Sequence, residues 1–529
     1  MKIRRSLTFL PVAVAALAGL TAVAAAEGSR VAPGPLAPPV LSAPAATAIA
    51  AVVPSPVPGN PRELKYDGLK FEIPKADSLR FKLKSGLTVY VAEDHSLPLV
   101  NVSLTLRAGG FLDPAGKTGL ASMTGTMLRQ GGTARLTAEE FDEKADFLAA
   151  EISTSAGDTQ AGANLNCLST VLAPSLDLFF EMLRAPRFQQ SRLDVEKGNW
   201  LEDMKQRNDD AGSILSREYT WLIYGDQQVP GRYSTSKDAD AIGRDDLVAF
   251  HKNFWRPEAG MILAVSGDVK TKDILAELDR RFEGWKTTGP VLPWPPPVPT
   301  WTPKPGLYHV EKDIPQGKVN IGHLASRWDR WDNPDNFTSI VMNDILGGGG
   351  FTSRIVKKVR SDEGLAYSAG SRYGIGTWWP GQFAMSYQSK NPTVALAAKL
   401  SIAELKRLQD EAVPADELTV AKNSFIDTFP RNFESPQKTA QLFATDDFMG
   451  RPHSYWDAYR ERISKVTSAD VQRVAKERLH PDRLVFLVVG KWSEIEPGDA
   501  NGRASMKEFF GGKVMHLPLR DPLTLQPMK

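Results

Sequence analysis

The chain has 529 residues, of which 64 are Lys or Arg and 62 are Asp or Glu, so its net charge is only +2. This balance argues against a general nucleic-acid binder, because phosphate binding needs a net basic surface. With 42% hydrophobic residues the chain is not disordered, and its length allows two or more domains with sizeable cores. The single cysteine, Cys167, excludes an intrachain disulfide and any cysteine-based zinc or iron–sulfur site.

The first residues have the pattern of a secretory signal peptide. A basic start, residues 1–5, precedes an uncharged apolar run, residues 6–22, and residues 24–26 (AAA) fit the small-residue cleavage pattern. The run falls short of the roughly 20 residues that a membrane span needs, and no later stretch approaches that length. We therefore expect cleavage near Ala26, no transmembrane segment afterwards and a periplasmic location, where structural disulfides are optional.

Two proline-rich stretches divide the remaining chain. Residues 31–61 hold nine prolines, which exclude a helix or a central strand and predict an extended tether. Eight prolines between residues 290 and 305 predict a linker between two halves. The expected domains are residues 1–26 (signal peptide), 27–76 (tether), 77–288 (N-terminal domain), 289–306 (linker) and 307–529 (C-terminal domain).

The predicted elements follow a similar plan in both halves. In the first half, alternation predicts strands at residues 79–83, 87–92 and 99–107, and spacing predicts helices at 116–130, 138–150 and 176–183. In the second half, strands near residues 306–310 and 319–323 precede helices at 336–346, 394–410 and 416–425.

One segment occurs in both halves. Residues 242–257 (IGRDDLVAFHKNFWRP) align without gaps on residues 466–481 (VTSADVQRVAKERLHP). Each predicts a turn, a helix with apolar positions three or four apart, and a proline stop. An apolar run that ends in glycine follows each copy, at residues 261–267 and 484–490, and predicts a buried strand. We infer two copies of an α+β unit.

Residues 114–132 (PAGKTGLASMTGTMLRQGG) resemble the N-terminal signature of the insulinase/pitrilysin metallopeptidases, the inverzincins. In that family the two histidines of H-x-x-E-H lie on one helical face and bind zinc, while the glutamate activates water. The corresponding residues here are Ser122, Gly125 and Thr126. No two of the seven histidines lie within five residues of each other, which also excludes a relocated motif.

The third zinc ligand of the family is a glutamate on a later helix. Residues 195–208 (VEKGNWLEDMKQRN) resemble that segment, and Glu202 stands at the ligand position. A single carboxylate cannot hold zinc, and an ordinary surface carboxylate is the simpler interpretation. We therefore expect neither a metal nor a catalytic residue in this chain alone.

Residues 343–367 (NDILGGGGFTSRIVKKVRSDEGLAY) resemble the C-terminal domain of the same family. There an arginine and a tyrosine, seven residues apart, face the zinc from the other domain and bind the substrate backbone. Arg360 and Tyr367 match that spacing, so the resemblance implies that these two residues bind substrate. A guanidinium and a phenol both donate hydrogen bonds to a carbonyl oxygen or an oxyanion.

Two further segments resemble parts of the family. The glycine run at residues 347–350 suits a turn with positive φ or a close backbone approach, and it resembles the glycine-rich loop of the non-catalytic processing-peptidase subunit. Residues 151–159 (EISTSAGDT) resemble the edge strand with which substrates pair.

The resemblance implies an α+β fold of two homologous domains, each an antiparallel-rich sheet packed with helices, which form half of a clamshell. It implies the zinc-free subunit of a periplasmic heterodimeric peptidase, inactive alone, with a peptide substrate and a homologous partner that carries H-x-x-E-H and zinc. The alternative is a catalytically inactive peptide-binding or scaffold protein with the same fold. Self-contained hydrolysis has little support, because Cys167 lies in a predicted strand and Ser122 has no histidine nearby in sequence.

Overall fold

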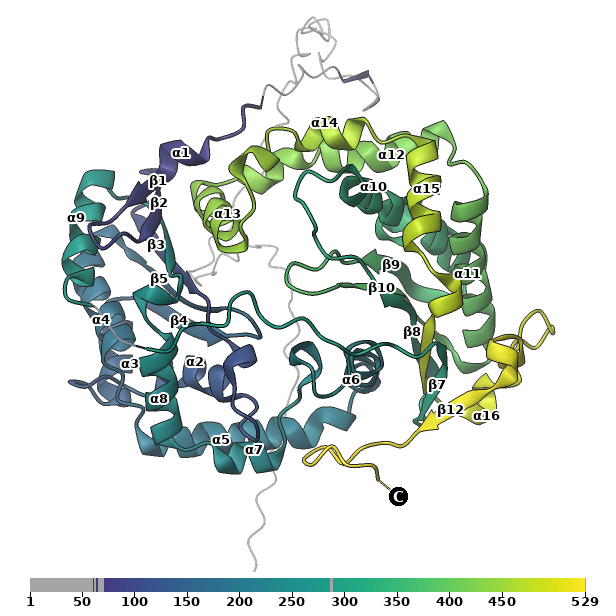
Figure 1. Ribbon diagram of the computed structural model, residues 1–529, viewed down its shortest axis with the longest axis horizontal. Coiled ribbons are helices and arrows are strands. Elements are labelled where there is room, and N and C mark those ends of the chain that lie inside the picture. Colours follow the sequence, from purple (N-terminus) through teal and green to yellow (C-terminus); the bar gives the residue numbers. More distant parts are fainter. Residues whose placement is uncertain (1–59, 61–62, 65–70, 286–288, 529) are drawn as a thin grey trace, which may run out of the picture. The chain divides into compact units, whose positions relative to one another are not determined.

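The structure is a computed structural model that describes residues 60, 63–64, 71–285 and 289–528. The predicted signal peptide and most of the predicted tether lie outside the described residues. The described residues from 71 onward belong to one compact unit (Figure 1). None of the helices in these ranges is long and apolar enough to cross a bilayer.

A six-stranded sheet in the order β1-β2-β6-β3-β5-β4 forms the centre of the first half. The neighbours β2 and β6 are parallel, and every other pair is antiparallel. The strands are β1 (Arg80–Lys82), β2 (Thr88–Glu93), β3 (Leu99–Leu106), β4 (Glu151–Ala156), β5 (Ala161–Leu168) and β6 (Ile262–Gly267).

The second half has its own six-stranded sheet, in the order β12-β7-β11-β8-β10-β9. Five strands repeat the order of the first sheet, whereas the sixth differs: β1 precedes β2 and is antiparallel to it, and β12 comes from the end of the chain and is parallel to β7. The strands are β7 (Gly306–Glu311), β8 (Gln316–Leu324), β9 (Ala366–Tyr373), β10 (Gln382–Lys390), β11 (Val485–Gly490) and β12 (Val514–Leu517). The predicted α+β class with two similar halves is confirmed.

Helices cover both sheets, and two π-helical segments interrupt the second half. The helices of the first half are α1 (Ala76–Leu79), α2 (Leu120–Gln130), α3 (Ala138–Phe147), α4 (Leu172–Arg184), α5 (Gln190–Lys205), α6 (Ala211–Tyr224), α7 (Ser236–Ala241), α8 (Arg244–Phe254) and α9 (Thr271–Phe282). Those of the second half are α10 (Pro334–Asn343), α11 (Val394–Asp410), α12 (Ala415–Ile426), α13 (Pro436–Met449), α14 (Tyr459–Ser464), α15 (Ser468–Arg478) and α16 (Trp492–Ile495). The π-helical segments are η7 (Asp344–Gly348) and η9 (Val356–Asp362).

Each half places one helix on the sheet of the other half. Helix α13 contacts β2 and β6, while α6 contacts β8 and β11 (Figure 1). Strands β6 and β11 are therefore buried on both faces, which explains why they read as unbroken apolar runs. Tyr90 of β2 donates a hydrogen bond to Asp447 of α13, so a polar contact also holds α13 on the first sheet.

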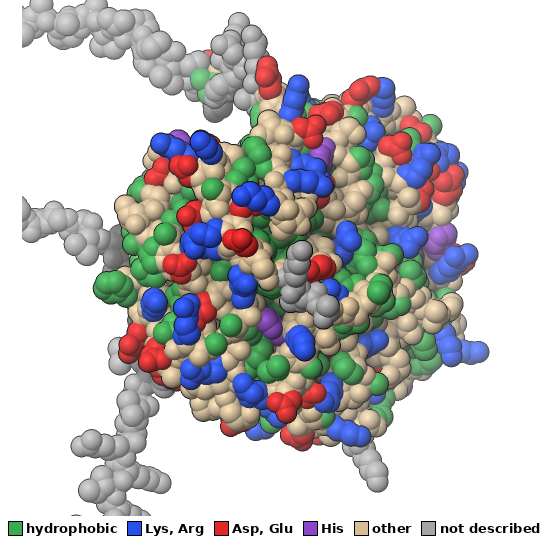
Figure 2. Space-filling model, turned by 60° about the vertical axis from the view of Figure 1, so that its left-hand side comes forward, with side chains coloured by type: hydrophobic (Ala, Val, Ile, Leu, Met, Phe, Trp, Pro, Cys, Tyr) green, Lys and Arg blue, Asp and Glu red, His purple; other side chains and the backbone are tan. Residues whose placement is uncertain are grey.

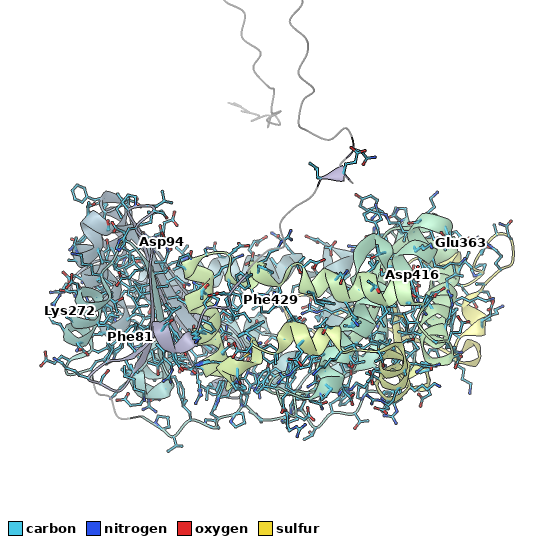
Figure 3. The ribbon with its side chains drawn as sticks, turned by 90° about the horizontal axis from the view of Figure 1, so that it is seen from above. Phe81, Asp94, Lys272, Glu363, Asp416 and Phe429 are labelled. Atoms are coloured by element: carbon cyan, nitrogen blue, oxygen red, sulfur yellow. The ribbon has the colours of Figure 1, made fainter. Side chains whose placement is uncertain are left out.

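The connection from α12 to α13 crosses between the halves. In Figure 3, seen from above, Phe81 and Lys272 mark one end, Glu363 and Asp416 mark the other, and Phe429 lies between them. Phe429 is 1% exposed and stacks on Tyr459 with ring centroids 5.4 Å apart. Its burial holds the crossing segment in place.

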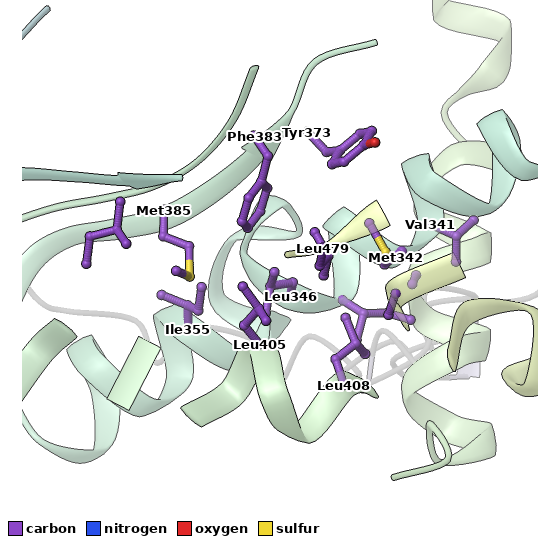
Figure 4. Close-up of a cluster of buried hydrophobic side chains, with 14 of the residues drawn as sticks. Val341, Met342, Leu346, Ile355, Tyr373, Phe383, Met385, Leu405, Leu408 and Leu479 are labelled. Carbon is purple, nitrogen blue, oxygen red and sulfur yellow. The ribbon is translucent and has the colours of Figure 1, made fainter. Parts of the chain in front are cut away.

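The repeated segment adopts the same structure in both halves. Helices α8 and α15 are each followed by a one-turn helix that begins with proline, and then by the buried strands β6 and β11. Below the second sheet, side chains such as Leu346, Ile355, Met385 and Leu405 form a continuous apolar core (Figure 4).

Several predicted helices begin or end elsewhere: that of residues 138–150 ends at Phe147, and that of residues 176–183 runs from Leu172 to Arg184. The helix predicted from residue 116 starts at Leu120, because Gly116 and Gly119 have φ of +77° and +97° and cannot belong to a right-handed helix. The helix predicted over residues 336–346 is α-helical only to Asn343 and continues as the π-helical segment η7. Such π-helical turns often occur at functional sites.

Candidate functional site

The helix that resembles the zinc helix lies directly against the edge strand β4. A Cβ atom on Gly125 would lie 2.7 Å from the backbone nitrogen of Ala156, and Thr154 Oγ1 donates a 2.6 Å hydrogen bond to the Gly125 carbonyl oxygen. Contacts this short leave no room for a side chain at position 125 unless β4 moves. The position of the family's glutamate is therefore closed by backbone packing.

The other two positions of the motif do not form a metal site. Ser122 is exposed and Thr126 is partly buried, and neither has a side chain that serves as a usual zinc ligand. Within the described ranges, no group of three or more His, Cys, Asp or Glu is arranged to hold a metal ion. The residues present do not fit the zinc that the family implies.

Glu202 lies on α5 as a surface carboxylate. Its side chain is 58% exposed and pairs with Lys205 Nζ at 3.0 Å, one helical turn away. This is the simpler of the two interpretations, and an exposed pair of this kind contributes little to stability.

A small pocket of about 220 Å³ adjoins Ser122 at the start of α2. Its lining includes Asp113, whose carboxylate accepts hydrogen bonds from the backbone N–H groups of Gly119 and Ala121 at 2.7 and 2.8 Å. Burial raises the pKa of Asp113 to about 6. Through its hydrogen bonds to Gly119 and Ala121, the carboxylate caps the helix, in the way that aspartate stabilises many helix N-termini.

The structure gives no support to another nucleophile. Cys167 is 1% exposed on β5, and burial raises the pKa of its thiol, so the reactive thiolate is disfavoured. The Ser122 hydroxyl makes no hydrogen bond to any residue of the described part, so no base activates it.

The Arg360–Tyr367 pair is brought together at the edge of the second sheet. Arg360 lies on η9 and Tyr367 on the edge strand β9, and the guanidinium carbon of Arg360 lies 4.7 Å from the centre of the Tyr367 ring. The same guanidinium lies 4.5 Å from the ring centre of Phe351, a partner that spacing alone did not reveal. The Arg360 guanidinium makes no hydrogen bond or ion pair with any described residue, so its side-chain N–H donors are unused.

Two features hold this pair in position. The Arg354 guanidinium forms a bidentate ion pair with the Glu417 carboxylate, with hydrogen bonds of 2.8 and 2.7 Å. This pair links the segment before η9 to α12. Gly347, in the glycine run, comes so close to β9 that a Cβ atom would lie 2.3 Å from Ser371 N. Gly350 has φ of +62°, so both uses expected of the glycine run are confirmed.

Comparison with known proteins identifies the class. Residues 241–425 match the peptidase M16 inactive domain. The non-peptidase homolog YmxG of Helicobacter pylori is 23% identical over 410 residues, which cover 76% of this chain and 91% of that protein. An uncharacterized zinc protease of Rickettsia bellii is 23% identical over 77% of this chain and 96% of its own length.

Solved structures show the same fold. The peptidase M16 inactive domain from Pseudomonas fluorescens has a TM-score of 0.69 at 23% identity and covers 78% of this chain and 97% of that one. The periplasmic protease PqqL from Escherichia coli has a TM-score of 0.65 at 12% identity, with 78% of this chain matched to 45% of that one. The protein is thus a two-sheet α+β protein with the M16 architecture. Residues 241–425 match the inactive domain of the M16 (insulinase/pitrilysin) peptidases, which confirms the predicted resemblance to that family.

Proposed function

We propose that this chain is the zinc-free subunit of a periplasmic heterodimeric metallopeptidase, in which Arg360 and Tyr367 bind peptide in trans to a partner with H-x-x-E-H and zinc. The observation that carries the proposal is the state of Arg360. Its guanidinium lies over the rings of Phe351 and Tyr367 while its N–H groups have no acceptor among the described residues. The side chain is oriented by contacts that leave all of its hydrogen-bond donors free.

This arrangement suits a carbonyl oxygen or a developing oxyanion. A guanidinium N–H and a phenol O–H are fixed donors, and Tyr367 is 85% exposed, so a ligand can reach both. Because Ser122, Gly125 and Thr126 do not fit zinc, activation of water is assigned to the partner. This chain would bind and orient the peptide.

The length of one structural relative supports a second unit. The periplasmic protease PqqL leaves more than half of its chain unmatched, since only 45% of it is covered by this protein. A partner of the same fold would supply the equivalent of that unmatched part. The signal-peptide pattern of residues 1–26 supports the periplasmic location.

The test is zinc content and peptide hydrolysis of the purified mature chain, measured alone and after mixing with a co-encoded H-x-x-E-H homologue. We expect neither zinc nor activity alone and activity on mixing. Chelator-sensitive activity in the chain alone would contradict the assignment of zinc to the partner.

A second function is favoured by one observation. The Helicobacter pylori relative is named a non-peptidase homolog, which fits a peptide-binding or scaffold protein that lost catalysis altogether. If the mixture does not hydrolyse peptide but the chain alone still binds it, this second function is supported.

A further inference from the structure

Strand β9 contains a bulge at Tyr367. Ala369 pairs with Tyr387 and Ala366 pairs with Ser389, so Tyr367 and Ser368 together face the single residue between them on β10, Gln388. Both are exposed, although consecutive side chains of a regular strand point to opposite faces. A bulge re-aims side chains in this way and is common beside functional sites.

The bulge opens onto a groove of about 450 Å³ next to Tyr367. Its lining includes Gln316, Gln388, Thr393 and Lys390, and Lys390 is the one charged residue among the lining residues. Gln388 Nε2 donates to Gln316 Oε1 at 2.7 Å, whereas the Lys390 ammonium group makes no hydrogen bond or ion pair with any residue that the structure describes. The groove therefore offers an uncompensated ammonium group.

The three strands that contribute to this groove carry charges of one sign. Strands β8, β9 and β10 contain no Asp or Glu, and their three charged residues are Lys318, Arg372 and Lys390. Lys318 is paired with Asp210 at 2.9 Å, whereas Arg372 has no acceptor among the described residues. Elsewhere positive and negative side chains are interspersed, as on the face shown in Figure 2. A local excess of positive charge attracts anionic groups.

We propose that this groove binds a carboxylate of the peptide whose backbone is held by Arg360 and Tyr367. The inference rests on the proposed function and names its ligand class: an extended peptide with an acidic side chain, or a free C-terminal carboxylate, at the position that reaches Lys390. The ammonium of Lys390 binds the carboxylate, and the side-chain amide of Gln388 lies beside it.

The experiment is calorimetric titration of the full mature chain with four N-acetylated short peptides of Ala, Val and Ser. They carry a central Asp or Asn and end in a free carboxylate or an amide. We expect at least one acid form to bind about fivefold more tightly than its neutral match, and the difference to shrink with added salt. An effect of Asp over Asn identifies a side-chain carboxylate, and an effect of the free end identifies a terminal one.

A matched pair of variants assigns the effect. Lys390→Gln should abolish the preference for the acid form, whereas Lys406→Gln, at an exposed lysine on α11 with no ion pair to a described residue, should keep it. Equal affinities for acid and neutral peptides would overturn the inference. If these equal affinities are still weakened by Arg360→Ala, the proposed function stands; if Arg360→Ala has no effect or no peptide binds, both fail.

Discussion

Both halves bring a glycine directly against the edge strand of their sheet, but they present different chemistry beside it. In the first half, Gly125 of α2 packs on β4; in the second, Gly347 of η7 packs on β9. A Cβ atom at either position would lie within 2.7 Å of strand backbone atoms. Close packing of a glycine against the edge strand is thus common to both halves and does not depend on metal ligands in the helix.

The difference lies in the side chains next to the glycine. Ser122 and Thr126 in the first half are small and neutral, whereas Arg360 and Tyr367 in the second half are strong donors beside a bulged strand. The comparison teaches that the fold keeps its edge geometry in both halves and that recognition chemistry is concentrated in the second.

Acid should weaken the second half before the first. His323 is 3% exposed, donates from Nδ1 to the Leu324 carbonyl at 2.7 Å and accepts the His480 N–H at Nε2 at 3.0 Å, an arrangement that requires the neutral ring. Burial lowers its pKa to about 4, below the unfolded value near 6.5. The unfolded chain then binds more protons, so stability is complete above pH 6.5 and about 3 kcal/mol is lost as the pH falls to 4.

Hydrogen exchange at pH 7 and pH 4.5 measures this difference. Peptides from β8 and β10 should lose protection before those from β3 and β5, and His323→Gln should reduce the pH dependence of the unfolding free energy. His95→Gln is the control. The hydrogen bond to Asp268 raises the pKa of that exposed ring, so its contribution to stability changes with pH in the opposite direction. Equal loss of protection in both sheets would contradict the prediction that acid weakens the second half first.

The glycine contacts predict the next largest effect. Gly125→Ala and Gly347→Ala should each lower the free energy of unfolding by about 2 kcal/mol, because the added methyl group displaces an edge strand. Denaturant unfolding measures the change. Gly198→Ala on α5, where a Cβ atom meets nothing within 4 Å, should be stabilising by up to about 1 kcal/mol. A neutral result at Gly125 would show that the zinc-helix position is not closed by packing.

The donor pair predicts a smaller effect on rate. Arg360→Ala should lower the hydrolysis rate of the mixed complex about tenfold, and Tyr367→Phe should lower it less, because each change removes one donor to the substrate oxygen. Assembly, followed by size-exclusion chromatography, should be unchanged. If both variants hydrolyse peptide at the wild-type rate, Arg360 and Tyr367 do not act on the substrate in trans.

The repeated helices predict the smallest effect. Thr467 Oγ1 caps α15 by accepting the Asp470 N–H at 3.1 Å, whereas the N-cap residue of α8 is Gly243, which has no side chain for this bond. Thr467→Ala should therefore cost about 1 kcal/mol of unfolding free energy, and Gly243→Thr should gain a few tenths, as thermal unfolding would show. Equal, negligible changes would mean that the two copies do not differ at this cap.

Much of the candidate site was predictable from local sequence. The spacing of Arg360 and Tyr367 and the replacement of the zinc-site residues by Ser122, Gly125 and Thr126 are visible in single short segments. The contribution of Phe351 was not, because an exposed aromatic residue in a one-turn helix gives no sign of the side chain that it contacts. The bulge at Tyr367 was hidden as well, since it depends on the register with β10.

By itself, the sequence determined that the motif lacks zinc ligands, that an α+β unit is repeated, and that the strands β6 and β11 are buried. These properties follow from residue chemistry and local periodicity. Only the tertiary structure decided that α6 covers the second sheet and α13 the first. An apolar helix face shows that a helix must be covered but not which surface covers it, and contacts such as that between Tyr90 and Asp447 join residues far apart in the chain.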